Sequence, residues 1–259
     1  MAGTTWRIIR IDGNERVDRE DRIAEEFALT IQLDGEEFAT LVCTPSDLDD
    51  LVIGFLASEG VIRRAEDIKD LSVDEKRGFA YVSLFVPQSV GKEFYAKRII
   101  GSCCGKSRQF YFYNDARTAK TITGGIRLTV AQCFALMKQL QSSSLAFQET
   151  GGVHNAALAD ETGLKAARTD IGRHNALDKL FGHTLRHRIE AKRHAIVFSG
   201  RISSEVVLKT AKIGCPILLS KSAPTDLALR LAEDLGITCV GFIRGDGMNI
   251  YTHAERILT

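Results

Sequence analysis

Apolar and polar residues alternate over residues 27–44, and the alternation breaks at Asp34-Gly35. A period of two is typical of strands with one buried face, and Asp-Gly is a preferred two-residue hairpin turn. The apolar period becomes helical over 46–59, where Ser46 is the candidate N-cap. A further strand is predicted over 79–86. Together these elements indicate a small α+β unit at the N-terminus.

The second half of the chain contains a longer series of elements. An amphipathic helix is predicted over 129–141, a hairpin over 155–171 and a second helix over 174–187. Three short apolar runs then alternate with two helical segments, and a short edge strand follows. The runs cover 195–198, 216–219 and 237–242, and the edge strand covers 249–252. Runs that are apolar on both faces favour a parallel sheet covered by helices.

These patterns predict an α/β protein with two domains. The N-terminal α+β domain is assigned to 1–100. The order of a hairpin, a helix and then strand-helix-strand-helix-strand resembles the cytidine deaminase fold, so a three-layer α/β/α domain with a mixed sheet is assigned to 126–259. Between them, 101–125 is rich in Gly, Ser, Lys and Arg without a sustained period, and is interpreted as a linker.

A zinc site of the deaminase kind is not expected. Zinc deaminases need a His-x-Glu motif at one helix start and Cys-x-x-Cys at the next. This chain has His174-Asn175-Ala176 at the first place and Ser203-Ser204-Glu205 near the second. A nucleoside or base deaminase therefore remains a weak alternative, which stoichiometric zinc in the purified protein would revive.

The linker carries two adjacent thiols, Cys103 and Cys104. Neighbouring Cα atoms lie about 3.8 Å apart and a relaxed disulfide needs roughly 4.4–6.8 Å, so the two should remain thiols. Lys106 and Arg108 favour the thiolate, which attacks other sulfur atoms. The alternative is that both cysteines are small residues packed in a turn.

Composition narrows the function classes. The 259 residues are 44% hydrophobic and 26% charged, which is typical of a folded globular protein. A formal net charge of +1 provides no field for nucleic acid or an anionic membrane, and neither partner is predicted. The six cysteines are scattered apart from one pair, and no signal peptide or apolar run of about 18 residues is evident. A reducing, cytoplasmic location is expected.

Basic residues follow each of the three predicted parallel strands: Arg201, Lys221 and Arg244. The carboxyl ends of such strands meet at one edge of the sheet, where ligands bind, and helix N-termini there attract phosphate. Ser203 or Ser204, and Thr225, have a simpler explanation as N-caps, but capping does not require the basic residues. The pattern predicts a phosphate or pyrophosphate site.

Two His-Asn pairs suggest a second part of the same site. His154-Asn155 precedes the hairpin, and His174-Asn175 follows Arg173 at the start of a helix. A histidine there can act as acid, base, ligand or charge donor. The alternative is that Asp170 caps the helix and His174 bonds the backbone.

Several motifs in this order resemble the formate dehydrogenase accessory sulfurtransferase family, FdhD. The C-terminal motifs cover 151–158, 170–179, 199–205, 222–225 and 241–244, and the N-terminal ones cover 44–48 and 53–60. The resemblance implies a cytoplasmic homodimer that accepts sulfur as a persulfide from a cysteine desulfurase. It implies transfer of that sulfur to the molybdenum cofactor, Mo-bis(molybdopterin guanine dinucleotide), for formate dehydrogenase.

The family's cofactor-binding stretch corresponds to a run near the C-terminus, and the predicted cofactor contacts add five residues to it. The run is Phe242, Ile243, Arg244, Gly245, Asp246 and Gly247, and the additions are Arg201, Lys221, His154, Arg173 and His174. Family members commonly carry Cys-Gly-x-Cys-Gly, but Gly101 stands where the first cysteine would be. Cys104 is the predicted persulfide carrier and Cys103 a helper or alternate. The alternative is a non-catalytic chaperone that binds the cofactor.

Overall fold

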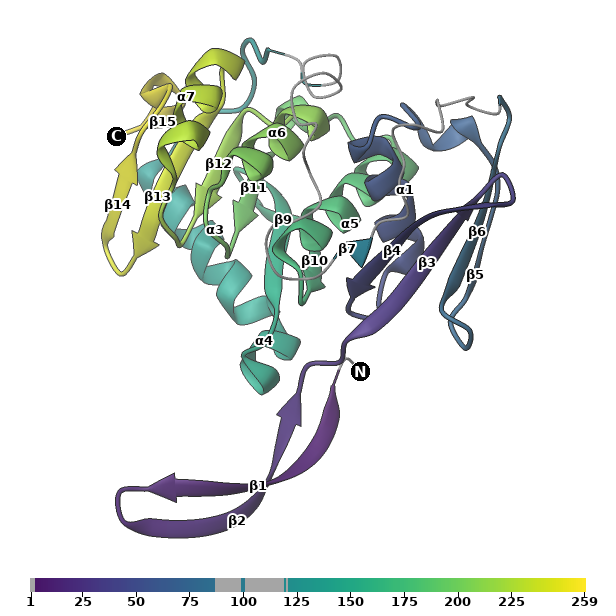
Figure 1. The fold of residues 1–259 in the computed structure, drawn as a ribbon. Helices are drawn as coiled ribbons and strands as arrows, with labels where there is room; N and C mark the ends of the chain where they lie inside the picture. The colour runs from purple at the N-terminus through teal and green to yellow at the C-terminus, as the bar shows by residue number, and fades with distance from the viewer. Residues whose placement is uncertain (1–2, 87–98, 101–118, 120) are drawn as a thin grey trace.

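The computed structural model describes residues 3–86, 99–100, 119 and 121–259. The fold is mixed α/β, with sheets of five and six strands and two two-stranded sheets (Figure 1). This confirms the predicted fold class. Among the described residues, no helix is both long and apolar enough to cross a membrane.

The N-terminal half is built on a five-stranded sheet in the order β5-β6-β3-β4-β7. The predicted hairpin is confirmed as β3–β4, and Asp34 and Gly35 at its turn have φ of 49° and 85°. Two positive φ values in succession give the turn that matches the strand twist. The elements are β1 Thr4–Asp12, β2 Glu15–Ile23, β3 Phe27–Leu33, β4 Glu36–Cys43, α1 Leu48–Ser58, η1 Ala65–Asp67, β5 Ile68–Asp74, β6 Phe79–Leu84 and β7 Ile99–Ile100.

The start of α1 differs from the sequence prediction. The N-cap is Asp47, with φ 49°, and no side chain caps the helix. Ser46 instead lies 3.4 Å from the Lys179 ammonium, which donates to its hydroxyl. The prediction of Ser46 as the N-cap is wrong, because its hydroxyl accepts a hydrogen bond from a lysine far away in the chain, which a local sequence pattern does not reveal.

The C-terminal half confirms the predicted series of elements. Its six-stranded sheet has the order β10-β9-β11-β12-β13-β14; β11, β12 and β13 are parallel, and β14 is the antiparallel edge strand. The elements are β8 Leu128–Thr129, α3 Val130–Ser143, α4 Leu145–Thr150, β9 His154–Asp160, β10 Gly163–Asp170, α5 Arg173–Arg186, η2 Ala191–Arg193, β11 Ala195–Phe198, α6 Ser204–Ile213, β12 Ile217–Ser220, α7 Asp226–Leu235, β13 Thr238–Arg244, β14 Gly247–Ile250, η3 Ala254–Arg256 and β15 Ile257–Leu258.

Helices cover both faces of this sheet. Alternate side chains of β11 show the division: Ala195 and Val197 pack in the core with α3, whereas Ile196 and Phe198 pack in the core with α5, α6 and α7. Every residue of β11 is buried, as expected of a strand covered on both faces. The apolar runs therefore correctly predicted a sheet covered by helices on both faces.

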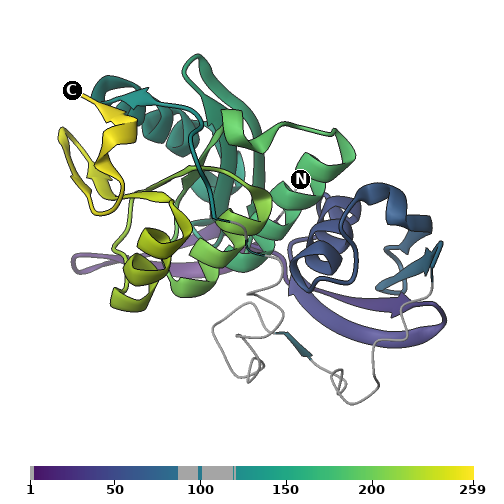
Figure 2. The same cartoon turned by 90° about the horizontal axis from the view of Figure 1, so that it is seen from above.

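The two halves join through α1 and α5, which cross at very close range (Figure 2). A Cβ on Gly54 would lie 1.7 Å from the Asp178 carbonyl oxygen, and one on Gly182 would lie 1.9 Å from that of Asp50. Only glycine permits this approach of two helix backbones. A single hydrophobic core then runs from the five-stranded sheet through both helices to the six-stranded sheet. The predicted domain boundaries stay a prediction, and most of the linker 101–125 lies outside the described residues.

The β1–β2 hairpin and β5 were not predicted from the sequence. β1 and β2 pair along their full length and extend below both halves in Figure 1. Charged residues interrupt β2 at almost every position, so no buried face marks it as a strand.

Candidate functional site

Five chain segments end at one edge of the six-stranded sheet. The parallel strands β11, β12 and β13 have their carboxyl ends there. Because β9 runs antiparallel to β11, its first residue, His154, lies at the same edge, opposite Asp170 at the end of β10. The structure therefore brings both predicted groups of site residues, the histidine segments and the strand-end loops, to one place.

Ser222 joins the loops that follow these strands. Its hydroxyl donates to the Ser199 carbonyl at 3.2 Å, and its own carbonyl accepts from the Phe242 amide at 3.2 Å. Ile202 and Thr225 also bond across the first two loops, through backbone contacts of 3.0 Å each. The three loops therefore form one continuous rim.

His154 lies at one end of this rim. Its Nδ1 is 3.5 Å from the Ser199 hydroxyl, which also accepts from the Asn155 amide at 2.9 Å. Burial lowers the pKa of His154 below its ordinary value, and the nearby Arg173 charge lowers it further, whereas Asp170 acts in the opposite sense. His154 is therefore held neutral, as an acceptor or donor rather than a fixed charge.

Arg173 and His174 occupy the first turn of α5. Arg173 packs beside Gly200, where an added Cβ would lie 3.5 Å from the arginine Cβ. The Nε2 of His174 is 3.1 Å from a Glu205 carboxylate oxygen in the first turn of α6. The histidine thus bridges two helix starts through a side-chain partner.

The predicted basic residues differ in their surroundings. Arg201 is exposed and Lys221 half-buried on the rim. The Nε of Arg244 donates to the Lys221 carbonyl at 3.0 Å, and its guanidinium lies 5.7 Å from the centroid of the Phe242 ring. Arg244 is therefore positioned by its neighbours, with Phe242 held at a left-handed φ of 54°.

The other residues of the predicted cofactor-binding run, Ile243 to Gly247, do not all lie on the rim. Ile243 is buried in the core shared with α3, so its side chain faces away from the rim. Gly245 and Asp246 form the exposed turn between β13 and β14, and Gly247 begins β14. The third loop therefore leads into a strand, and only the first two lead into helices, as predicted.

Cys103 and Cys104 lie outside the described residues. The other four cysteines are buried. Burial raises the pKa of Cys43 and Cys239 to about 12 and that of Cys133 to about 11, and it also raises the pKa of Cys215. Thiols with such pKa values are protonated at neutral pH and are poor nucleophiles.

The described residues contain no group of three or more His, Cys, Asp or Glu side chains that could hold a metal ion. Glu205, which stands near the expected position of a deaminase thiolate, is instead close to His174. The donor set at this edge is mainly basic and hydroxylic, which suits an anion.

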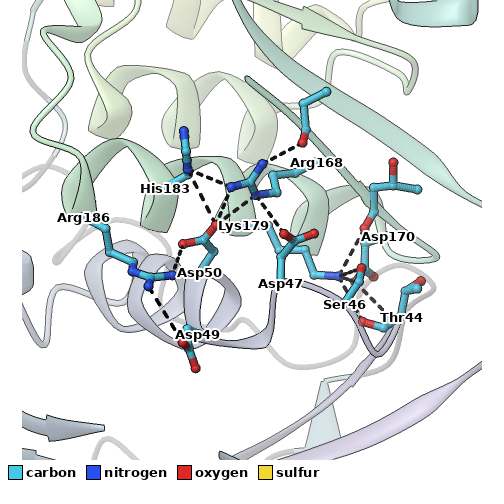
Figure 3. A network of polar contacts seen from close by, with 12 residues as sticks. Thr44, Ser46, Asp47, Asp49, Asp50, Arg168, Asp170, Lys179, His183 and Arg186 are labelled. Atoms are coloured by element: carbon cyan, nitrogen blue, oxygen red, sulfur yellow. Dashed lines mark hydrogen bonds and ion pairs between the residues drawn. The ribbon is translucent and has the colours of Figure 1, made fainter. Parts of the chain in front are cut away.

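Much of the polar segment 170–179 is buried, and Figure 3 shows two of its members, Asp170 and Lys179. Asp170 and Lys179 are fully buried and pair at 2.7 Å. Asp170 accepts from the Thr44 amide at 3.0 Å, and Lys179 donates to the Thr44 carbonyl at 3.0 Å. Gly172, not Asp170, is the N-cap of α5. This cluster fastens the end of β4 to the edge that carries the candidate site.

A second cluster in Figure 3 centres on Asp50 of α1. Asp50 pairs with Arg168 at 2.7 Å and with Arg186 at 2.9 Å. Arg168 also donates to Nδ1 of His183 at 2.7 Å, since a guanidinium has no acceptor. Burial and the charge of Arg168 lower the pKa of His183. Both clusters join the two halves of the molecule rather than forming a reaction site.

A basic groove of about 900 Å³ lies at the opposite ends of α5 and α6. Its basic lining is Arg63, Arg64, Arg188, Lys192 and Lys212, and none of the predicted site residues that the structure describes contributes to it. α5 has 14 residues, so the groove is roughly 20 Å from the sheet edge. The groove is separate from the sheet edge and is an alternative place for an anion to bind.

Comparison with known proteins decides the family. The sequence pattern of the FdhD/NarQ family matches residues 24–258. The chain belongs to the FdhD/NarQ family. Among FdhD/NarQ relatives, a "Sulfur carrier protein FdhD" from Geobacillus kaustophilus is 62% identical over 242 residues, covering 93% of this chain and 92% of the relative. Another with that description, from Halalkalibacterium halodurans, is 58% identical over 98% of this chain and 95% of its own.

A solved structure shares the fold of this FdhD/NarQ chain. The crystal structure of a candidate formate dehydrogenase accessory protein from Desulfotalea psychrophila matches with a TM-score of 0.81 and 27% identity, covering 100% of both chains. The resemblance first seen in separate motifs therefore extends through the whole arrangement of elements.

Sequence reasoning missed the residues that hold the site together. Ser222 and Glu205 make their contacts across loops that are distant in the chain, and neither position carries a local signal beyond an ordinary loop serine or helix-start acid. Ser222 and Glu205 could have been found only from the order of the strands, which shows which loops and helix starts meet at the sheet edge.

Proposed function

We propose that this FdhD/NarQ-family protein is a sulfurtransferase that carries sulfur as a cysteine persulfide to the molybdenum cofactor needed by formate dehydrogenase. The observation that carries the proposal is the high identity to relatives described as sulfur carrier proteins, over nearly the whole chain. The proposed donor is a cysteine desulfurase. The cofactor, in its guanine dinucleotide form, is the proposed substrate.

Cys104 is the proposed carrier and Cys103 its helper. The four described cysteines are buried with raised or strongly raised pKa values, which leaves the linker pair as the candidates for thiolate chemistry. The described chain leaves β7 at Ile100, beside Leu41 of β4. Three residues further along the chain, directly after the end of β4, Thr44 bonds Asp170 at the candidate edge. The linker therefore departs from a strand that leads to the proposed acceptor site.

The first transfer balances without an external oxidant or reductant. The Cys104 thiolate attacks the terminal sulfur of the donor's persulfide. A sulfur–sulfur bond forms to Cys104 while the donor's sulfur–sulfur bond breaks, and the donor cysteine leaves as a thiolate with the electron pair. Lys106 and Arg108 would stabilise the persulfide anion. In the second transfer, the sulfur–sulfur bond at Cys104 would break and Cys104 would leave as a thiolate with the electron pair, while the cofactor, as the substrate in its reduced form, would accept the sulfur atom and supply the two electrons that reduce it to sulfide.

The acceptor site is proposed at the rim of the six-stranded sheet. Arg201, Lys221 and Arg244 supply positive charge there, and α6 and α7 begin directly behind the first two loops. His154, Arg173 and His174 extend the same edge. The diphosphate of a guanine nucleotide would bind the basic side chains through its charge. The guanine ring would stack on Phe242, which is partly exposed beside Arg244.

The carrier assignment is tested by loading the protein with a cysteine desulfurase and cysteine, then locating added sulfur by mass spectrometry. We expect wild type to gain one sulfur on a linker cysteine and Cys104→Ala to lose most of the loading. Cys103→Ala should retain it in part. Cys239→Ala is the matched control and should load like wild type, since that thiol is buried. Loading of both linker variants at the wild-type level would refute the mechanism.

A chaperone without sulfur chemistry is distinguished by function in the cell. Under the sulfurtransferase proposal, a double Cys103→Ser and Cys104→Ser variant should leave formate dehydrogenase inactive while the variant itself remains folded and abundant. Dehydrogenase activity at the wild-type level would instead support a cofactor-binding chaperone.

A further inference from the structure

The basic groove at the ends of α5 and α6 combines a charged rim with an apolar floor. Five basic and two acidic side chains line it, a net formal charge of +3. The whole chain has a net charge of only +1, so the positive charge is concentrated here. The apolar lining is Phe181, Leu185, Ile189, Ala191 and Ile213.

The ion pairs on one wall of the groove can be exchanged for pairs with another molecule. Arg188 pairs with Glu66 at 2.7 Å, and Lys192 pairs with Glu190 at 2.9 Å. These four side chains are between 48% and 79% exposed. Ion pairs between exposed side chains add little stability. A carboxylate from outside can therefore replace either internal partner at low cost.

The opposite wall carries two adjacent arginines, Arg63 and Arg64, which are both exposed. Their backbone amides donate to one carboxylate oxygen of Asp67, at 2.7 and 3.0 Å. The conformation of this turn therefore depends on backbone bonds, and the charges of the two side chains remain available to a partner.

The helix ends make the groove a poor site for a compact phosphate. α5 and α6 direct their carboxyl ends toward it, and that end of a helix carries partial negative charge. Lys212 already serves such an end, because its ammonium donates to the Ser58 carbonyl at the end of α1, at 2.7 Å. Phosphate sites use the amino ends of helices instead. Carboxylates spread along the rim, with apolar side chains over the floor, fit better, and an acidic protein segment supplies both.

The chain on either side of the cysteine-bearing residues is bonded beside this groove. Before them, the Phe85 amide donates to the carbonyl of Asp67 at 3.1 Å. After them, the Ile126 amide donates to the carbonyl of Lys192 at 3.2 Å. A protein seated in the groove would therefore lie next to the points where the cysteine-bearing segment leaves the fold and rejoins it.

We propose that the basic groove docks an acidic, partly apolar segment of the protein that donates sulfur. The proposal rests on the proposed function, which requires a donor, and adds where the donor binds. The groove is roughly 20 Å from the sheet edge, so donor and cofactor can be bound at the same time. Its bonds to the chain around the cysteines favour the sulfur donor over the dehydrogenase as the occupant.

Sulfur loading of the full chain from two different donors tests the docking site. Arg63→Glu combined with Arg64→Glu reverses two rim charges and keeps the amide bonds to Asp67. We expect the concentration of cysteine desulfurase that gives half-maximal loading rate to rise at least tenfold, with the maximal rate within about twofold of wild type. Glutathione persulfide is a small donor that needs no docking surface, so it should load the variant like wild type.

Lys76→Glu combined with Arg77→Glu is the matched control. These residues are also adjacent and exposed, but they follow the far end of β5, whose seven residues at about 3.3 Å each place them roughly 20 Å from the groove. This control should load from the desulfurase like wild type.

Three results would overturn the docking site. They are wild-type dependence on desulfurase concentration in the groove variant, equal impairment of the control, and slow loading of the groove variant from glutathione persulfide. Inorganic phosphate that binds wild type but not the groove variant would identify a small-anion site and would also overturn it. Failure of wild type to load from either donor would instead contradict the proposed function, and the docking site with it.

Discussion

Residues of the candidate site and residues that stabilise the fold lie next to each other in the chain. In the segment 170–179, Arg173 and His174 face the candidate edge, whereas Asp170 and Lys179 are buried and fasten it to β4. The sequence shows a segment rich in polar residues but does not show which of them are buried. Their burial depends on α1 and β4, which pack over the segment from more than a hundred residues away in the chain. The histidines could be selected from the sequence, but their partners could not.

The buried pair gives a prediction about stability. Lys179→Met removes the ammonium and leaves the Asp170 carboxylate buried without its counter-ion, so the free energy of unfolding should fall by about 3–5 kcal/mol. Urea denaturation measures this. The double variant Asp170→Asn and Lys179→Met should recover a large part of the loss, because no buried charge then remains. A single variant as stable as wild type would show that the pair does not hold this junction.

His154 gives a prediction about protonation. Its folded pKa is below the ordinary value of 6.5, first through burial and then through Arg173. Its contribution to stability is therefore complete above the unfolded pKa and is lost as pH falls toward the folded pKa. In an NMR titration, Arg173→Gln should raise the pKa of His154 toward its ordinary value, though not fully, because burial remains. The pKa of His183, which burial and Arg168 lower without any contribution from Arg173, should stay unchanged and is the control.

At the scale of elements, local patterns predicted the elements that bury one face or both. The β3–β4 hairpin, α3 and α5 carry periodic apolar residues, and the strands β11 and β12 are continuous apolar runs. The β1–β2 hairpin has no buried face and was not predicted. The crossing of α1 and α5 was not predicted either, since a glycine within a helix pattern does not reveal what approaches it.

The helix crossing gives a prediction at this scale. Gly54→Ala puts a methyl group 1.7 Å from the Asp178 carbonyl oxygen, so the helices must separate and the free energy of unfolding should fall by at least about 3 kcal/mol. Gly247→Ala is the control, because its added Cβ would come no closer than 3.8 Å to the Arg244 carbonyl, and its effect should stay within about 0.5 kcal/mol. Thermal and urea unfolding measure both. Equal stability of the two variants would contradict the close crossing.

At the scale of the whole molecule, one core links the two sheets, and the candidate site lies where the second sheet, α5 and the end of β4 meet. The sequence predicted the two groups of elements and the edge at which ligands would bind, because the rule for parallel strands needs only strand order. It could not predict that three polar clusters would fix the halves together. The third joins Asp178 to Lys209 and Ser58.

The proposed function requires a nucleotide-bearing cofactor to bind at this sheet edge. A crystal structure of the full chain with guanosine diphosphate bound decides whether it does. We expect the diphosphate within hydrogen-bonding distance of Arg201 or Lys221, with His154 and Arg173 beside the same ligand. Guanosine diphosphate found instead in the basic groove between Arg63, Arg188 and Lys192 would contradict it.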